Sequence, residues 1–405
     1  MSAAPQVAST PDTQKVLREQ EKRRSCREKE ESRAPWASVT LSAVSFAALV
    51  ARVPYHTWGR GQIEIPSASL WKELSFSGVV GGLMSVALGL AVARGWRRAC
   101  LAMIPLFLAL PFVLHFEHSF PPCGLFFSIS FGVWKTIEVL TGQHRPAIFH
   151  SPTAHILHFA SPIEFQTIPS GQLPSPPSPR EVLTHVGETA TTALGLSIVS
   201  SIRALAFQTD ATVGMVGPQL SAWAKTYTDV WLCYLFFRLN TGFSSILLAL
   251  GGLKPQRVWR QPLTRATSPS DFWARRWNLW VHGLFHRTVF LPASKAGCPP
   301  SVAALTAFAI SGILHEFAFL AGCRGRGFGG QVIFFTLQAL LVSAQKWLTR
   351  RVGVPALLQA SPLLCILINN VLLLPSAPLF MWALREGGVL AEMEMLTPRL
   401  GMRSA

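Results

Sequence analysis

Apolar runs long enough to cross a membrane recur along the whole chain, and a helix needs about 20 apolar residues to span a bilayer. Candidate spans lie near residues 36–53, 76–95, 99–115, 124–140, 189–206, 226–250, 301–323, 329–347 and 354–384. Asn369, Asn370 and Pro375 interrupt the last run, which is therefore one broken helix or two. Because 50% of the 405 residues are hydrophobic and 14% are charged, an ordinary soluble domain is excluded. The sequence predicts an all-α polytopic membrane protein with eight to nine transmembrane helices.

The charge of the connecting segments predicts the orientation of the chain. The net charge is +16, and the basic residues are spread between apolar spans, which argues against nucleic acid as a partner. The most basic section is 251–299, with eight basic residues against one acidic residue. Arg94, Arg97 and Arg98 lie between two expected spans. These segments and the N-terminus are expected on the cytosolic side, in contact with anionic lipids or anionic ligands.

Composition divides the chain into three parts. Residues 1–34 carry eight basic and six acidic residues without an apolar core, which is typical of a disordered cytosolic arm rather than a signal peptide or a mitochondrial presequence. Residues 35–385 are expected to form the membrane-embedded body, with its chemical motifs in 251–320. Residues 386–405 are expected to be a C-terminal tail. Within the body, the polar section 141–188 contains a Pro/Ser-rich loop.

The cysteines and most of the histidines do not indicate a metal site. The seven cysteines contain no C-x-x-C pair and show no regular spacing, so we expect neither a disulfide framework nor a zinc site. His155 and His158 have a spacing that metal ligands use, but no adjacent pair of histidines occurs anywhere in the chain. A di-iron site of the membrane desaturase kind requires several histidine clusters, so this alternative is disfavoured and we expect no metal.

The basic, tryptophan-rich stretch from Asp271 to Arg287 is the most informative part of the sequence. Ser268 can cap a helix that begins at Pro269, Asp271 completes the capping pattern, and Leu291-Pro292 would end the helix. At 100° per residue, apolar side chains fall within about 60° of one another and polar side chains within about 80° on the opposite face. The apolar set is Trp273, Trp277, Trp280 and Leu284, and the polar set is Arg275, Asn278, His282 and His286.

An amphipathic helix lying in the membrane interface would account for most of this pattern without any chemistry, because tryptophan and arginine are enriched there. Asn278 is the residue that this interpretation leaves unexplained. His282 and His286 share the face of Asn278 and are therefore better candidates for a site than the other histidines outside the spans.

His315 lies inside the apolar run 301–323, in the sequence SGILHEF. An ionisable group at that depth is costly, so a functional role is the default hypothesis. Small residues such as Ala307, Ser311 and Gly312 would let neighbouring helices approach closely, which favours a buried polar site. The alternative is a structural histidine that is hydrogen-bonded between helices.

The stretch DFWARRWN together with a later intramembrane histidine resembles the membrane-bound O-acyltransferases. Within them it is most similar to the wax synthase branch, where the stretch reads close to DFWGRRWN, with Ala274 here in place of the glycine. The resemblance is specific over about 271–320. It implies that His315 and Asn278 are catalytic. The candidate substrate-binding residues on the same stretch are Trp273, Arg275, Arg276, Trp277, His282 and His286.

The chemistry of these residue types agrees with an acyl transfer. A histidine of near-neutral pKa can remove the proton of a hydroxyl that attacks a thioester, and Asn278 can stabilise the oxyanion or orient the acceptor. The resemblance implies acyl-CoA as co-substrate, no bound cofactor, a long-chain fatty alcohol as acceptor and the endoplasmic reticulum as location. Arg275 and Arg276 would bind the phosphates of the donor.

Two alternatives remain open at this level. The same chemistry could use a sterol, a glyceride or a small secondary metabolite as acceptor. A non-enzymatic transporter or scaffold is less favoured, because the two halves show no symmetric interrupted helices. The sequence indicates neither the acyl length nor the oligomeric state.

Overall fold

The computed structural model describes residues 62–64, 68–149, 151–168, 172–207, 218–353, 361–397 and 399–401. The chain divides into two units, 1–54 and 55–405, and every described residue belongs to the second. The expected arm 1–34 and the expected first span 36–53 lie outside the described residues.

Three helices form the first group of the fold: α3 (Ala68–Ala93), α4 (Arg97–Val113) and α5 (Phe120–Leu140). Leu88, Leu125 and Ile129 are fully buried between them. α3 and α5 approach closely because a glycine faces a serine, and a Cβ on Gly132 would overlap Ser85. The 3-10 turn η2 (Pro146–Phe149) and helix α6 (Pro152–Ala160) follow and pack beside α3.

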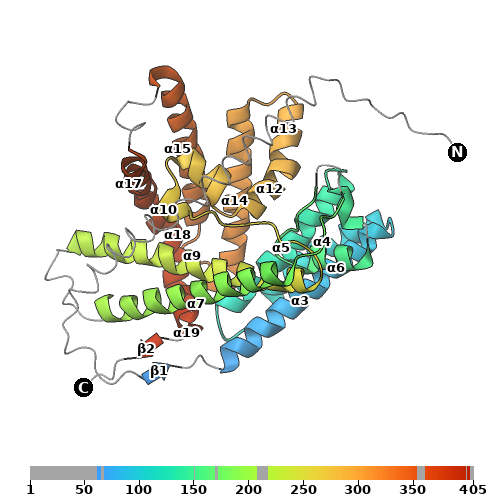
Figure 1. The fold of residues 1–405 in the computed structure, drawn as a ribbon, viewed down its shortest axis with the longest axis horizontal. Coiled ribbons are helices and arrows are strands. Elements are labelled where there is room, and N and C mark those ends of the chain that lie inside the picture. The colour runs from blue at the N-terminus through green and yellow to red at the C-terminus, as the bar shows by residue number, and fades with distance from the viewer. Residues whose placement is uncertain are drawn as a thin grey trace. The chain divides into compact units, whose positions relative to one another are not determined.

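Two long helices, α7 (Pro179–Phe207) and α9 (Pro218–Leu250), form the second group and lie side by side in Figure 1. Their close contact again depends on a glycine, since a Cβ on Gly242 would overlap the hydroxyl of Thr189. Short helical pieces follow over 262–295: α10 (Pro262–Arg265), α11 (Pro269–Asp271), the π-helical turn η3 (Phe272–Arg276), α12 (Leu279–Phe285), the π-helical turn η4 (His286–Phe290) and α13 (Leu291–Lys295).

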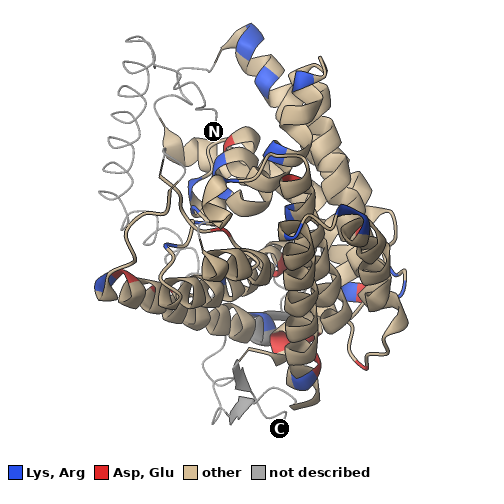
Figure 2. Ribbon diagram, turned by 90° about the vertical axis from the view of Figure 1, so that its right-hand side faces the viewer, with Lys and Arg blue, Asp and Glu red and all other residues tan. Residues whose placement is uncertain are grey.

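The C-terminal part contains α14 (Pro300–Cys323), α15 (Gly330–Val352), α17 (Pro362–Leu373), the 3-10 turn η5 (Leu374–Ser376), α18 (Ala377–Glu386) and α19 (Val389–Met395). Two short strands, β1 (Gln62–Glu64) and β2 (Arg399–Gly401), pair antiparallel. The segment expected to be a tail therefore contains α19. In Figure 2 the long ribbons carry few Lys, Arg, Asp or Glu residues.

The all-α polytopic membrane class is confirmed. Six helices of the described part are long and apolar enough to cross a membrane: Ala68–Ala93, Phe120–Leu140, Ser221–Leu250, Pro300–Cys323, Gly330–Val352 and Pro362–Glu386. The expected spans 99–115 and 189–206 correspond to α4 and α7, which are helical but are not among these six. The last apolar run is broken as expected, because η5 separates α17 from α18 around Pro375.

Candidate functional site

The tryptophan-rich stretch begins as the sequence predicts but does not form one helix. The Ser268 hydroxyl accepts a hydrogen bond from the Asp271 backbone N–H at 3.1 Å, and Pro269 occupies the first helical turn. The chain then makes the π-helical turn η3 and leaves the helical conformation at Trp277, whose backbone is extended. Asn278 follows with a φ of 39°, in the left-handed region. The prediction of a continuous helix from Pro269 to Leu291 is therefore wrong.

Asn278 starts a new helix instead of lying within one. Its side-chain oxygen accepts a hydrogen bond from the Val281 backbone N–H at 3.4 Å and so caps α12. Asparagine is one of the few residues that tolerate the left-handed conformation and also cap helices well. The amide nitrogen of Asn278 takes no part in this contact, and no other hydrogen bond of it is found in the described part of the chain.

Because the helix is broken, the apolar and polar residues do not occupy two opposite faces. Trp273 points toward α14 and α15, where its ring lies 5.5 Å from that of Phe308 and its Nε1 donates to Gln338 at 3.1 Å. The ring of Trp277 lies beside that of Trp273, with centroids 6.2 Å apart, and also contacts Trp259 at 5.1 Å. Trp280 packs instead against Phe131 of α5, with centroids 4.3 Å apart, so the prediction of one face shared by all these rings is wrong.

The predicted end of the helix at Leu291-Pro292 is also wrong. Pro292 lies in the first turn of α13, which continues directly from η4. Proline is tolerated at this position because it lacks only a backbone N–H, and the N–H groups of a first helical turn have no acceptor within the helix.

The two predicted donor-binding arginines have different surroundings. Arg276 is engaged, because its Nε donates to the Asp271 carboxylate at 2.6 Å and its guanidinium also donates to the Arg260 carbonyl at 3.3 Å. Arg275 is exposed, and within the described residues it makes no ion pair or hydrogen bond. Only Arg275 presents an uncommitted cation.

His282 and His286 lie one helical turn apart, with stacked rings whose centroids are 6.0 Å apart. His282 is exposed and lies near the charged ammonium of Lys346 on α15. Burial, and then the neighbouring Arg287 guanidinium, lower the pKa of His286 below its ordinary value. The structure thus keeps these two histidines together, at the end of α15 that carries the basic residues.

His315 is held in a defined tautomer by its own helix. Its Nδ1 lies 2.7 Å from the carbonyl oxygen of Ser311, one turn earlier in α14. A carbonyl can only accept, so Nδ1 carries the hydrogen and Nε2 keeps its lone pair. No protein group within the described ranges hydrogen-bonds Nε2. The prediction that His315 lies in a membrane-length helix is confirmed, and its free nitrogen has the form that a proton acceptor requires.

Aromatic rings surround the imidazole of His315. Ring centroids of Phe335, Phe127 and Phe380 lie 4.7, 5.1 and 5.6 Å away. These residues come from α15, α5 and α18, so three helices distant in sequence enclose the ring. The side chain is half-buried, and its apolar surroundings favour the neutral imidazole.

Glu316, which follows His315, has a structural task that the sequence did not reveal. Its buried carboxylate accepts hydrogen bonds from the backbone N–H groups of Gly329, Gln331 and Val332 at the start of α15. A carboxylate is stabilised at a helix N-terminus. A Cβ on Gly312 would come within 2.9 Å of the Val332 backbone, so α14 and α15 are in tight contact below His315.

Ring contacts connect the tryptophan-rich stretch to His315 along two routes. Trp273 lies 6.0 Å from Phe335, which contacts His315. On the other side, Trp280 lies 4.3 Å from Phe131, which stacks on Phe127 beside His315. The two segments that the sequence singled out are therefore parts of one site region, formed by α5, α12, α14 and α15.

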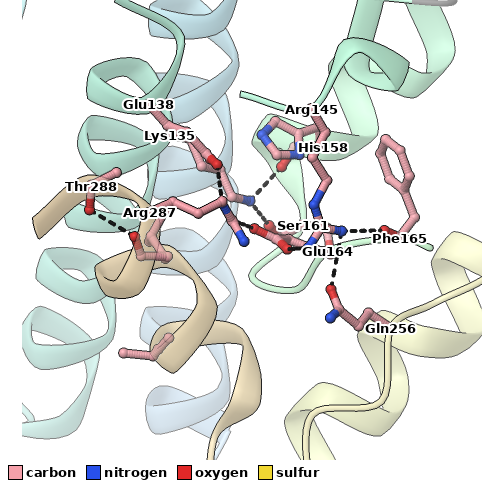
Figure 3. A network of polar contacts seen from close by, with 12 residues as sticks. Lys135, Glu138, Arg145, His158, Ser161, Glu164, Phe165, Gln256, Arg287 and Thr288 are labelled. Atoms are coloured by element: carbon pink, nitrogen blue, oxygen red, sulfur yellow. Dashed lines mark hydrogen bonds and ion pairs between the residues drawn. The ribbon is translucent and has the colours of Figure 1, made fainter. Parts of the chain in front are cut away.

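A group of charged residues, which we name the Arg287 cluster, lies next to this region (Figure 3). Lys135 and Glu138 belong to α5 and Arg287 to η4, and Arg145 and Glu164 lie in connecting segments. The Arg287 guanidinium pairs with both Glu138 and Glu164, and Arg145 pairs with Glu164 at 3.0 Å. The Lys135 ammonium donates to the carbonyls of His158 and Ser161 and lies 5.4 Å from the Trp280 ring centre. Lys135 and Glu138 lie in an apolar run, which is the sequence signal that could have identified them.

The other candidate ligands do not form a metal centre around His155 and His158. The ring of His155 faces the Gly89 carbonyl at 2.9 Å, while burial, and then the Lys135 ammonium, lower the pKa of His158 well below its ordinary value. Within the described ranges, three candidate ligands come together only at Glu73, Glu117 and His118. There the Glu73 carboxylate already accepts from the backbone N–H groups of Glu117 and His118.

Comparisons with known proteins find a similarity to one family in this region. Residues 258–337, which contain both Asn278 and His315, match the Membrane bound O-acyl transferase family. The chain is 33% identical over 97 residues to diacylglycerol O-acyltransferase 1 of Arabidopsis thaliana, covering 24% of this chain and 18% of that protein. The chain thus spans less than a quarter of that relative's length.

Two further relatives from Arabidopsis thaliana match longer stretches. Probable long-chain-alcohol O-fatty-acyltransferase 3 is 27% identical over 169 residues, which are 39% of this chain and 48% of that protein. Acyl-CoA–sterol O-acyltransferase 1 is 29% identical over 130 residues, which are 30% of this chain and 37% of that protein.

Proposed function

We propose that the chain is a member of the membrane-bound O-acyltransferase superfamily and that it transfers an acyl group from acyl-CoA to a lipid hydroxyl. The observation that carries this proposal is the state of His315, whose Nδ1 is held by the Ser311 carbonyl and whose Nε2 is free among aromatic rings. This geometry supports a general base in a water-poor site. We further propose that residues 35–385 form the catalytic unit and that 251–320 contains its reacting groups.

In the proposed reaction, His315 Nε2 takes the proton of the acceptor hydroxyl as the hydroxyl oxygen attacks the thioester carbonyl. General base catalysis of this kind contributes roughly 10²–10⁴-fold. The Asn278 amide nitrogen, which its helix cap leaves unused, donates to the developing oxyanion. The aromatic rings around His315 keep out water that would hydrolyse the thioester.

The proposed donor site lies in the basic section. Arg275 is the exposed, uncommitted cation beside Asn278, and it would contact a phosphate of acyl-CoA. His282, His286 and Lys346 lie near one another and would add further donors. Arg276, which is paired with Asp271, would act on the site by holding η3 in place. Trp273 and Trp277 would line the site through their ring contacts.

We propose a long-chain fatty alcohol as acceptor, which would make the product a wax ester. The support is that the relative named for that activity matches the largest share of this chain among the three described above. The relatives named for sterol and diacylglycerol acylation make these acceptors the alternatives to test.

The proposed orientation places the basic end of the helices in the cytosol. Loops at the other end, 114–119, 324–329 and 386–397, carry two basic residues against four acidic ones. These loops touch one another, since Glu392 accepts from the backbone of Ser119 and Arg326 donates to the Glu386 carbonyl. The excess of positive charge on the side of 251–299 supports a cytosolic location for it, in the endoplasmic reticulum membrane.

An acceptor panel tests the proposal. The full chain is expressed in a host that lacks neutral-lipid synthesis, and its membranes receive labelled acyl-CoA with a fatty alcohol, a sterol or a diacylglycerol. We expect labelled ester from the fatty alcohol, and none with a His315→Ala variant present at the same level. Ester from only a sterol or a diacylglycerol would replace the proposed acceptor, and no ester from any hydroxyl would overturn the enzymatic function.

A further inference from the structure

Two cysteines that are 200 positions apart in the sequence meet at the end of the bundle opposite the basic loops. Cys123 lies in the first turn of α5, and Cys323 is the last residue of α14. Both are buried free cysteines in the structure, and their side chains are neighbours. The backbone agrees with this contact, because a Cβ on Gly322, the neighbour of Cys323, would overlap the Cys123 sulfur.

The pair is enclosed on all the sides that the structure describes. Cys123 and Cys323 expose 1% and 2% of their surface. A Cβ on Gly387 would overlap the Cys323 sulfur, so the chain after α18 closes over the pair. The Glu392 carboxylate binds the backbone N–H groups of Ser119 and Phe120 at 2.8 and 2.7 Å, which ties α19 to the start of α5 next to Cys123.

The position of the pair relative to His315 suggests what a cross-link there would do. Phe127 is one helical turn from Cys123, and Phe319 is one turn from Cys323, with His315 one turn further. Phe127 lies 6.5 Å from Phe319 and 5.1 Å from His315. A bond between the two sulfurs would therefore fix the register of α5 against α14 directly beneath the rings that enclose His315.

We infer that Cys123 and Cys323 form a disulfide bond that fixes the helix carrying His315 against α5. The inference rests on the orientation proposed above, which places this end on the non-cytosolic side, where disulfides form and persist. Each thiol loses a proton, one S–S bond forms, and the electron pair passes to the disulfide of an oxidoreductase protein, which becomes a dithiol. Because the pair is buried in the folded chain, the exchange takes place during folding.

The alternative is that both cysteines remain thiols and fill space as small apolar side chains. Cys233 provides an internal comparison. It is as buried as the pair, at 2%, but its sulfur faces the Met381 sulfur at 4.0 Å, and no cysteine of the described ranges lies against it. We therefore expect it to stay a thiol in either compartment.

The test uses the full chain purified from eukaryotic membranes without reductant, denatured in excess alkylating reagent and digested. We expect a peptide pair joined through Cys123 and Cys323, which alkylation labels only after reduction, while Cys233 is labelled in both conditions. Alkylated Cys123 and Cys323 without reduction would overturn the inference. A glycosylation tag after Lys254, measured in the same preparation, separates the causes of failure. Free thiols with a modified tag mean that the orientation is wrong, and free thiols with an unmodified tag mean that the cross-link itself is wrong.

A second measurement tests the proposed effect on register. Reductant should lower the melting temperature of the wild-type protein and leave that of a Cys123→Ala/Cys323→Ala variant unchanged. Cys233→Ala serves as the matched control, and its melting temperature should still respond to reductant. If wild type and double variant respond alike, the bond does not stabilise the contact between α5 and α14.

Discussion

His315 and Arg287 both lie among packed helices, but they differ in how many of their polar atoms have partners. Around Arg287 every charged neighbour has a partner, with two carboxylates on the guanidinium and a third ion pair from Arg145. Around His315 the neighbours are phenylalanine rings, and Nε2 has no partner within the described residues. The two regions touch through Trp280, which contacts Lys135 on one side and Phe131 on the other.

We interpret the paired charges around Arg287 as structural and the unpaired nitrogen of His315 as part of the proposed chemistry. A buried cation whose charge is matched stabilises one arrangement of helices, and removing one partner leaves an uncompensated charge. Burial by itself would lower the pKa of Arg287. The charges of Glu164 and Glu138 more than offset this effect, so the pKa lies above its ordinary value and the group stays charged. A base must instead keep an unshared lone pair where substrate can reach it. The following predictions test this distinction, beginning with the largest effect.

The largest expected effect is on turnover after the free nitrogen is removed. His315→Ala and His315→Asn should both lower acyl transfer by roughly 10²–10⁴-fold, because neither provides a base. Asn keeps an N–H that can donate to the Ser311 carbonyl, so its protein level and melting temperature should equal those of wild type. Activity is measured per amount of monodisperse protein. An Asn variant with more than a few per cent of wild-type turnover would show that His315 is structural.

Arg287→Gln should mainly affect folding. It leaves Glu138 and Glu164 buried without their shared cation, a change that costs about 3–5 kcal/mol. Arg287→Lys should be more stable than Arg287→Gln but less stable than wild type, because a lysine cannot bind two carboxylates in the planar geometry of a guanidinium. The measurement is the yield and melting temperature in detergent, with the exposed Arg275→Gln as matched control. Equal stability of the two glutamine variants would contradict the structural role of the cluster.

Asn278 allows a similar separation within one side chain. Asn278→Asp keeps the cap on Val281 and tolerates the left-handed backbone, but it loses the amide N–H donors. We expect normal stability with turnover reduced by about 10²-fold, the loss typical of one oxyanion donor.

Asn278→Ala should show the same loss of turnover together with lower stability, by ~1 kcal/mol for the missing cap. If the Asp variant kept wild-type turnover, Asn278 would serve only as a cap.

The two neighbouring arginines extend the comparison to the donor. Arg275→Gln should raise the KM for acyl-CoA about tenfold, since one hydrogen bond to a charged group is worth ~1.5 kcal/mol or more. Arg276→Gln should instead lower the melting temperature, because Asp271 loses its partner. Steady-state kinetics with varied acyl-CoA and a fixed acceptor measure the first effect. A larger change in the KM for the acceptor than for acyl-CoA would mean that Arg275 is misassigned.

The smallest effect is expected at the edge of the His315 region. Trp273→Phe keeps an aromatic ring beside Phe335 but removes the donor to Gln338, at a cost of about 1 kcal/mol. The double variant Trp273→Phe/Gln338→Leu should cost less than the sum of the two single variants, because their shared hydrogen bond is lost only once, while Gln338→Leu also removes the bond to Ser376 at 2.6 Å. Thermal melting of the three variants and wild type measures the coupling between the two residues. No coupling would mean that the contact does not contribute to stability.

Some of the site could be predicted because it depends on neighbours in the chain. The start of the tryptophan-rich stretch at Ser268-Pro269 follows from local capping rules, and it is confirmed. The depth of His315 follows from the length of its apolar run. The continuous helix was wrong because the 100° rule assumes regular backbone, whereas the π-turn η3 and the left-handed Asn278 interrupt it.

Other features depend on residues that are far apart in sequence. Arg275 and Arg276 are adjacent residues of the same type, yet only Arg276 pairs with a carboxylate, that of Asp271. Arg287 meets Glu138 across 149 positions, and no periodicity encodes that pair. The spacing of the cysteines suggested no disulfide framework, and the meeting of Cys123 with Cys323 depends on how α5 packs against α14.

The sequence by itself thus determined the membrane class, the approximate positions of the apolar helices and the two segments that contain the candidate site residues. These properties depend on hydrophobicity and on short-range backbone preferences, which are additive along the chain. The tertiary structure alone decided which polar atoms are paired and which are free, because pairing requires two groups to meet at about 3 Å. That distance is set by the packing of helices, which gives Arg287 two carboxylate partners and, within the described residues, none to Nε2 of His315.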